Sequence, residues 1–273
     1  MRRAPAYLAG FGLAGLLLWG LAVEPYRLEV HRVTVRDPYF ARALAGLTVV
    51  QLSDLHLGAH PGPAEDRVRA VLAELKPDLI LLTGDYIEWR GDYAPALEFL
   101  GGLRARLGVY GVLGDYDWSR SRQACLFCHE PGSGRRRQGP GAHLLKDDAV
   151  VVCPNGREVW ITALDPEAEE GEDGQGPAVV ARPTIMLIHD PLQFDRLRAK
   201  APLLCLAGDT HGGQVRLPSW LWRLAGYENC ARYREGLFRR AQATLFVSRG
   251  IGTSHLPVRL GEPPEVSVFR FEP

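Results

Sequence analysis

Apolar runs and helical spacings alternate along the first half of the chain. Residues 27–36 alternate apolar and polar side chains and predict a strand. The apolar runs at 47–52 and 78–83 predict buried strands, and between them apolar residues recur at helical spacing until Pro77 ends the pattern. A second helical pattern follows and leads into the run VYGVL. The β-α-β-α-β order predicts a largely parallel sheet covered by helices.

The second half of the chain resumes this alternation after a long segment without periodicity. Residues 119–146 are rich in Gly, Ser and Arg and predict a basic loop insertion. Apolar runs resume at VVVC and EVWITAL, and the runs TIMLI and PLLCLA each precede a polar loop. No internal repeat interrupts residues 24–273, so we expect them to form one domain.

Residues 1–23 have the composition of an N-terminal signal anchor. Arg2 and Arg3 precede residues 7–23, which carry no charge and have a length near the lower limit of about 17 residues for a transmembrane helix. No A-x-A site ends the run, so an uncleaved anchor is favoured over a cleaved signal peptide, and the paired arginines leave export of a folded protein as an alternative. Positive residues on the N-terminal side predict a single-pass anchor in the cytoplasmic membrane, with the domain on the periplasmic or extracellular side.

Composition indicates a folded chain without a strongly charged partner. The chain has 273 residues and 46% hydrophobic content, enough to bury a substantial core. Lys+Arg and Asp+Glu both total 32, so no net field attracts nucleic acid, and we expect no nucleic-acid partner. The sequence leaves the oligomeric state open. Of the five cysteines, Cys153 and Cys205 lie in apolar runs and are predicted to be buried thiols.

Carboxylates and imidazoles follow five of the apolar runs, each where a predicted strand ends. In an α/β sheet the carboxyl ends of parallel strands share one edge, so these side chains are expected to converge there. A helix cap or a turn explains one such aspartate, whereas repetition at consecutive strand ends favours a divalent-metal site. The residues are Asp54, His56, Asp85, Asp115, Asp117, His189, Asp209 and His211.

The order of these motifs resembles that of the calcineurin-like metallophosphoesterases, in particular their membrane-anchored bacterial branch. The matching motifs are SDLHLG, LTGDY, VLGDYD, LIHDP and AGDTHGGQ. The ending VSRGIGTSHLPVRLGEPPEVSVFRF is similar to the closing strands of that branch, so the resemblance covers residues 30–271. It implies an α/β fold in which two mixed β-sheets form a sandwich flanked by helices, with a dinuclear metal centre at one edge.

The resemblance also implies a role for each strand-end residue. Asp54, His56 and His211 would bind one metal ion, and Asp85 would bridge to a second. His189 would bind the second ion, together with the residues at positions 115 and 209. Two such ions polarise a phosphate and generate a hydroxide nucleophile.

Two motifs depart from the family pattern. Where the family has G-N-H-D/E, this chain has Gly114-Asp115-Tyr116-Asp117, and where the family has G-H-x-H, it has Gly208-Asp209-Thr210-His211. The extra carboxylates bring the charge of the centre to about zero and favour manganese, magnesium or iron over zinc. Tyr116 and Asp117 would flank the leaving group. A phenol with a pKa of about 10 is a poor acid at neutral pH, so slow hydrolysis or a good leaving group is expected.

The segment Cys125-Leu-Phe-Cys128-His129 resembles a c-type haem attachment site. Its cysteines would form two thioethers, and His129 would be the proximal iron ligand. A surface disulfide is the first alternative. A zinc site that uses both cysteines, His129 and a further ligand such as His143 is the second.

These observations predict a metal-dependent phosphohydrolase that cleaves a phosphoester or pyrophosphate bond. The expected cofactors are two divalent metal ions, with haem c as a candidate addition. The expected substrate is a phosphorylated small molecule or a lipid-linked phosphate, and the N-terminal helix would contact the membrane. The alternatives are a haem-bearing redox or sensor protein on a catalytically weakened scaffold and a metal-binding interaction module.

Overall fold

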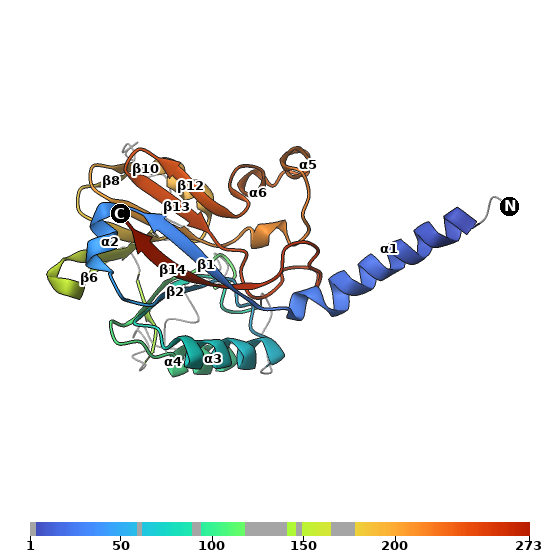
Figure 1. Ribbon diagram of the computed structural model, residues 1–273, viewed down its shortest axis with the longest axis horizontal. Coiled ribbons are helices and arrows are strands. Elements are labelled where there is room, and N and C mark those ends of the chain that lie inside the picture. Colours follow the sequence, from blue (N-terminus) through green and yellow to red (C-terminus); the bar gives the residue numbers. More distant parts are fainter. Residues whose placement is uncertain (1–3, 59–61, 89–93, 118–140, 146–148, 165–177) are drawn as a thin grey trace, which may run out of the picture.

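Two six-stranded mixed sheets pack face to face and form the body of the chain (Figure 1). The computed structural model describes residues 4–58, 62–88, 94–117, 141–145, 149–164 and 178–273. A short parallel pair, β8 (Ala178–Val180) and β10 (Leu197–Ala199), accompanies the two large sheets. The predicted fold class of two mixed sheets with flanking helices is therefore confirmed.

The first sheet contains the predicted β-α-β-α-β unit. Its neighbours are parallel except for β14 and β2, which are antiparallel. Helices α3 (Pro63–Leu75) and α4 (Ala94–Gly102) connect its central strands, and α3 ends before Lys76, whose φ of 48° is left-handed. In spatial order the strands are β1 (Glu29–Arg36), β14 (Glu265–Glu272), β2 (Val49–Leu52), β3 (Leu79–Thr83), β4 (Val109–Val112) and β5 (His143–Leu144).

The second sheet is parallel in its centre and antiparallel at both edges. In spatial order its strands are β12 (Gly236–Arg240), β13 (Ala243–Val247), β11 (Leu203–Ala207), β9 (Thr184–Leu187), β7 (Val159–Ala163) and β6 (Ala149–Val152). The short helices in the described residues are α2 (Pro38–Ala43), α5 (Ser219–Leu224) and α6 (Glu228–Tyr233), with 3₁₀ turns η1 (Glu24–Tyr26), η3 (Pro154–Gly156), η4 (Pro191–Arg196) and η5 (His211–Gly213).

Alternation along the strands divides the core into layers. Val49 of β2 faces the second sheet and packs in one cluster with Ile161 and Leu206, whereas Val50 faces α3 and α4 and packs with Phe99. Burial of both faces explains why these strands are short continuous apolar runs. The packing holds the carboxyl ends of β2, β3, β9 and β11 in fixed positions.

The cysteine predictions have different outcomes. Cys205 lies in β11 and is fully buried, as predicted. Cys153 is exposed, so the prediction for it is wrong. It directly follows the edge strand β6, where Val152 points inward and the next side chain therefore points outward.

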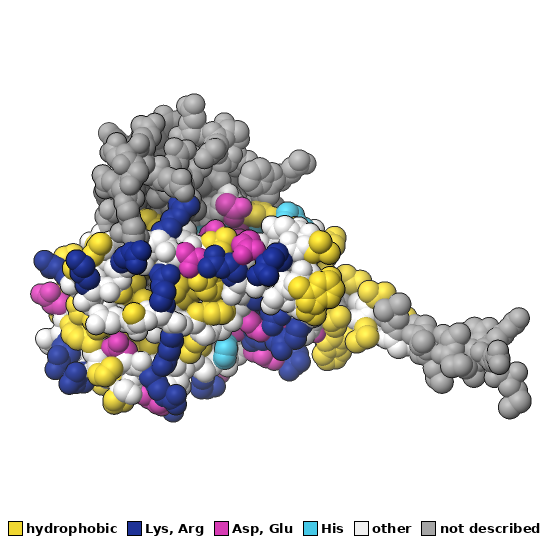
Figure 2. Space-filling view, turned by 90° about the horizontal axis from the view of Figure 1, so that it is seen from above, with side chains coloured by type: hydrophobic (Ala, Val, Ile, Leu, Met, Phe, Trp, Pro, Cys, Tyr) yellow, Lys and Arg dark blue, Asp and Glu magenta, His cyan; other side chains and the backbone are white. Residues whose placement is uncertain are grey.

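The first helix, α1 (Ala4–Ala22), projects away from the sheets (Figure 1). Large apolar side chains of its second half are exposed, including Leu17, Leu18 and Trp19. Figure 2 shows hydrophobic side chains gathered where this helix leaves the domain. Among the residues that the structure describes, no helix has the length and apolarity needed to cross a membrane.

Candidate metal centre

The predicted ligands lie in tight loops at the carboxyl ends of the strands. Ten non-glycine residues in the described part of the chain have a positive φ, and five of these are predicted ligands. Non-glycine side chains rarely adopt this conformation, and such strain clusters at functional sites. The five residues are Asp54, His56, Asp85, Asp209 and His211.

Glycines next to these loops make room for the carboxylates. A Cβ at Gly208 would collide with the side chains of Ser53 and Asp54. A Cβ at Gly114 would collide with the Asp85 side chain. The Gly-Asp pairs at 114–115 and 208–209 therefore have a steric reason, because each glycine leaves space for an aspartate that follows another strand.

A buried polar network connects the strand ends that carry the ligand loops. Gln51 Nε2 donates to Thr83 Oγ1 and to the carbonyl of Ala207, at 2.9 Å each. Thr83 Oγ1 in turn donates to Ser53 Oγ at 2.6 Å. These bonds join β2, β3 and β11, so they fix the ligand loops of both sheets relative to one another.

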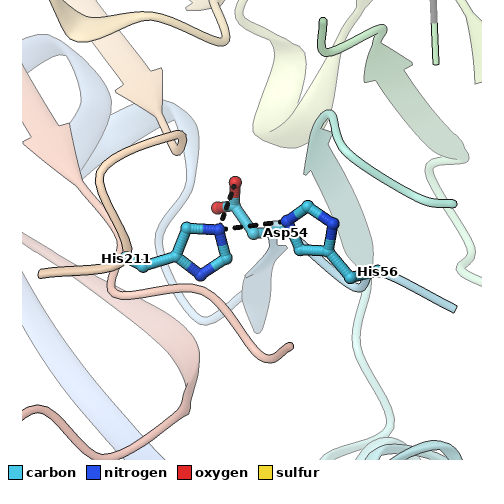
Figure 3. Close-up of side chains that lie close together, drawn as sticks. All are labelled: Asp54, His56 and His211. Carbon is cyan, nitrogen blue, oxygen red and sulfur yellow. Dashed lines mark hydrogen bonds and ion pairs between the residues drawn. The ribbon is translucent and has the colours of Figure 1, made fainter. Parts of the chain in front are cut away.

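Asp54, His56 and His211 come together as the first candidate metal position (Figure 3). All three side chains are buried. His56 Nε2 and His211 Nε2 are 3.0 Å apart, and His211 Nε2 lies 3.7 Å from Asp54 Oδ1. Two imidazoles and one carboxylate around one point form a donor set suited to a divalent transition metal.

Backbone contacts orient the histidine rings. His189 Nδ1 lies 2.8 Å from the carbonyl of Thr83, which leaves its Nε2 directed into the site. The His56 and His211 rings make backbone hydrogen bonds at Ile87 and Gly252. Metal-binding histidines commonly hold their second nitrogen in this way, which sets the tautomer and the ring direction.

Asp85 lies between the first candidate position and a second. Its Oδ2 is 3.5 Å from His56 Nε2, and its Oδ1 is 3.4 Å from His189 Nε2. The backbone N–H of Tyr116 donates to Asp85 Oδ1 at 3.0 Å. The two carboxylate oxygens therefore face opposite groups, which is the arrangement of a bridging ligand.

Asp115, His189 and Asp209 form the second candidate position. His189 Nε2 is 3.3 Å from Asp115 Oδ1 and 3.9 Å from Asp209 Oδ1. His189 is buried, whereas the Asp115 side chain is 66% exposed. The second position thus opens to solvent on the Asp115 side, and the first is enclosed.

Protonation follows from burial and from neighbouring charges. Burial lowers the pKa of His56 to about 3 and lowers the pKa of His211 well below its ordinary value, so both rings are neutral near pH 7. Burial raises the pKa of Asp85 and of Asp209 to about 7. Burial lowers the pKa of His189, but the nearby carboxylates of Asp85, Asp115 and Asp209 outweigh burial and raise this pKa well above its ordinary value.

The site fits divalent cations by a further criterion. Within the described part of the chain, Asp54 Oδ2 and His189 Nε2 are buried and make no hydrogen bond. Buried polar atoms usually have partners, so two unsatisfied ligand atoms in one cluster need an explanation. A divalent ion at each position would satisfy them and would neutralise the carboxylates.

Tyr116 and Asp117 have different environments. The Tyr116 and His56 rings pack edge to face, with 4.7 Å between their centroids, so Tyr116 lies beside the first position. Asp117 is buried, its Oδ1 accepts from the backbone N–H of Tyr86 at 2.8 Å, and its Oδ2 accepts from Gly114 at 2.9 Å. These contacts join two ligand loops. A role for either residue at the leaving group stays a prediction.

Two residues beside the site carried no signal in the sequence patterns. Arg259 is fully buried, and its Nη2 lies 3.4 Å from His211 Nδ1 and donates to the carbonyls of Arg249 and Gly252. Asn229 Nδ2 donates to Asp209 Oδ2 at 2.5 Å. Arg259 is 48 residues from His211 along the chain and Asn229 is 20 residues from Asp209, so neither spacing nor hydropathy could place them at the site.

The haem-like segment lies elsewhere in the chain. Cys125, Cys128 and His129 fall outside the described residues, as does most of the predicted basic loop at 119–146. Covalent haem, a disulfide and zinc therefore stay predictions.

Comparison with known proteins identifies the family. The sequence-family model for calcineurin-like phosphoesterases matches residues 47–213, and this range contains all seven predicted metal ligands. The chain is 27% identical to an uncharacterized metallophosphoesterase, YkuE of Bacillus subtilis, over 95% of this chain and 89% of that protein. It is 27% identical to the UDP-2,3-diacylglucosamine pyrophosphatase LpxG of Chlamydia muridarum, over 94% of this chain and 93% of that protein. It is 26% identical to the phosphodiesterase YaeI of Escherichia coli, over 89% of this chain and 87% of that protein. The chain therefore belongs to the calcineurin-like phosphoesterases, hydrolases that act on phosphate esters.

Proposed function

We propose that this protein hydrolyses a phosphoester or pyrophosphate bond at a dinuclear metal centre. The observation that carries this proposal is the position of Asp85, whose two oxygens face His56 on one side and His189 on the other. A carboxylate with one oxygen at each of two adjacent donor sets is suited to bridge two ions. Single-ion sites do not need this arrangement.

Each position has its own ligands. Asp54, His56 and His211 would hold the first ion, and Asp115, His189 and Asp209 would hold the second. The oxygen-rich second set suits manganese, iron or magnesium better than zinc. When bound, the pair of ions would polarise the phosphate and lower the pKa of a water that serves as nucleophile.

Arg259 changes the charge of the proposed centre. Four aspartates against two divalent ions leave a charge of about zero, and the buried guanidinium adds one positive charge. Burial lowers the pKa of Arg259 to about 10, so it stays charged at neutral pH. The centre is therefore net positive in spite of its additional carboxylates, which favours an anionic substrate.

Tyr116 would act on the leaving group as a hydrogen-bond donor. Burial and the charge of Asp115 raise the pKa of Tyr116 above its ordinary value, so the hydroxyl is neutral. A neutral phenol donates a hydrogen bond but transfers its proton poorly near pH 7. Substrates whose leaving group needs no protonation would react fastest, such as a pyrophosphate or an aryl phosphate.

A lipid-linked phosphate is the substrate class that we favour. The relative LpxG is named for a pyrophosphate bond in a diacylated sugar nucleotide, and YaeI for a phosphodiester. The exposed apolar side chains of α1 support contact with a lipid surface. A domain held at such a surface would meet its substrate in the bilayer.

The experiment is hydrolysis of an activated aryl phosphodiester by metal-free protein supplied with Mn²⁺, Fe²⁺ or Mg²⁺. We expect turnover with at least one ion and a loss of about a thousandfold in Asp85→Ala, because a bridging ligand acts on both positions. Glu228→Gln, an exposed change on α6, is the matched control and should keep the wild-type rate. Absence of turnover with every ion, or unchanged turnover in Asp85→Ala, would contradict the proposal.

A further inference from the structure

The second candidate metal position has a neighbour outside the segment that matches the family model. Helix α6 begins at Glu228, beyond residues 47–213, and it carries Asn229. The Asn229 side chain is half-buried and faces Asp209. Asp209 stands where the family has a histidine, so this contact belongs to the altered half of the site.

The contacts of Asn229 assign the direction of its amide. Its Oδ1 accepts from the backbone N–H of Cys230 at 2.8 Å, and its Nδ2 donates to Asp209 Oδ2 at 2.5 Å. Reversal of the amide would place an oxygen against the carboxylate and a nitrogen against an N–H donor. Only one direction satisfies both contacts, so Asn229 presents a fixed donor to Asp209.

The Asp209 carboxylate therefore has one oxygen for each neighbour. Oδ2 accepts from Asn229, whereas Oδ1 points toward His189 Nε2 at 3.9 Å. The backbone N–H of Asp209 donates to Asp54 Oδ1 at 2.9 Å, which fixes the main chain at the same point. A carboxylate held in this way offers a single oxygen to the second position, much as an imidazole offers a single nitrogen.

Helix α6 is attached to the Asp209 loop at further points. Thr210 Oγ1 donates to the carbonyl of Arg234 at 2.6 Å, and Cys230 Sγ lies 3.6 Å from the carbonyl of Thr210. The donor is thus carried by an element that packs directly on the ligand loop. Rotation of the Asp209 side chain would break the contact with Asn229.

We propose that Asn229 is a positioning residue that orients Asp209 as a one-oxygen ligand of the second metal ion. The inference rests on the proposed dinuclear site, but it concerns metal affinity and not the identity of the substrate. Loss of a group that orients a metal ligand typically weakens metal binding 10–100-fold. The first position does not contain Asp209, so its affinity should change little.

The test is a titration of the metal-free protein with Mn²⁺. Binding is measured by calorimetry and by the electron paramagnetic resonance signal of unbound Mn²⁺. In Asn229→Leu we expect the first ion to bind within about threefold of wild type and the second to bind about 10–100-fold more weakly. Asn229→Gln keeps an amide donor and should recover part of the loss. Glu228→Gln, the adjacent residue on α6, is the control and should bind both ions as wild type does.

Folding is checked by circular dichroism of each metal-free variant. A folded Asn229→Leu protein that binds the second ion with wild-type affinity, or that loses both ions equally, overturns the proposal. If Asn229→Leu does not fold, Asn229→Ser takes its place with the same expectations. A protein that binds two ions but hydrolyses no phosphate ester would refute the proposed function, whereas the role of Asn229 is decided by the affinities alone.

Discussion

His56 Nε2 and His211 Nε2 face each other at 3.0 Å inside the protein. Both rings make backbone hydrogen bonds on their other side, and burial keeps the pKa of each ring below its ordinary value. Two neutral rings therefore direct lone pairs to the same point, beside Asp54. This arrangement is unfavourable without a cation and favourable around one.

Metal removal should accordingly lower stability. Binding to the folded state alone stabilises it by about 2.7 kcal/mol when free metal is a hundred times its dissociation constant. We expect the thermal midpoint to fall in chelator and to recover with Mn²⁺. His255→Ala, on the exposed loop after β13, should respond as wild type does, whereas His211→Ala should respond much less. Equal midpoints of the wild type in chelator and in Mn²⁺ would contradict a cation at this position.

Replacement of Tyr116 by histidine should change which leaving groups react. A histidine with a pKa near 6.5 is a better acid at neutral pH than a phenol, and general acid catalysis is typically worth about 10²–10⁴-fold. We expect Tyr116→His to raise kcat/KM for an alkyl phosphodiester much more than for an activated aryl one. Tyr116→Phe is the control and should give no gain on either. An equal effect of Tyr116→His on both substrates would argue against Tyr116 at the leaving group.

Glu265 should make stability depend on pH in the acid range. Burial raises the pKa of Glu265, but the hydrogen bond from His31 and the charge of Arg249 outweigh it and lower it to about 2. Arg249 Nε lies 2.7 Å and His31 Nδ1 lies 2.9 Å from Glu265 Oε2. Since the folded pKa is below the ordinary value of 4.5, the stabilisation is complete above about pH 4.5 and is lost as pH falls toward 2.

The variant Glu265→Gln isolates this contribution. In metal-free protein it should lower the free energy of unfolding by about 3 kcal/mol at pH 6, and the difference from wild type should shrink toward pH 2. Denaturant unfolding at several pH values measures it. Glu272→Gln removes a half-exposed carboxylate 3.7 Å from Arg36 and should cost less than about 1 kcal/mol at any pH. A Glu265→Gln difference that is constant with pH would refute this assignment.

Haem attachment at Cys125, Cys128 and His129 is a separate prediction. Protein produced in a host that matures c-type cytochromes should show a Soret band and a positive haem stain after denaturation, and Cys125→Ser with Cys128→Ser should abolish both. Colourless wild-type protein from such a host would leave the disulfide and zinc alternatives.

The positions of the candidate ligands could be predicted because two regular signals coincide. Apolar runs locate the strands, and the carboxyl ends of parallel strands meet at one edge, so Asp54, Asp85 and His189 follow from pattern and topology together. Asp117 shows the limit of that reasoning. A motif gives the position of a residue, but only tertiary contacts determine that its carboxylate accepts from Tyr86 and Gly114.

Other features depend on contacts that the sequence does not encode locally. Asn229 and Arg259 reach the site from segments without a periodic signal, since a single polar side chain on a short helix or in a loop has no pattern. The N-terminal apolar run predicts a membrane span, and in the described ranges no helix is long and apolar enough to cross a bilayer. Cys153 is exposed because its position after an edge strand depends on strand order, which hydropathy does not define.

The most direct measurement is the rate of phosphodiester hydrolysis as a function of the Mn²⁺ bound per protein molecule. If Asp115, His189 and Asp209 form a working second position, activity should be low with one ion bound and should rise to its maximum between one and two. Full activity with a single bound ion, or no activity with two, would contradict a dinuclear phosphohydrolase.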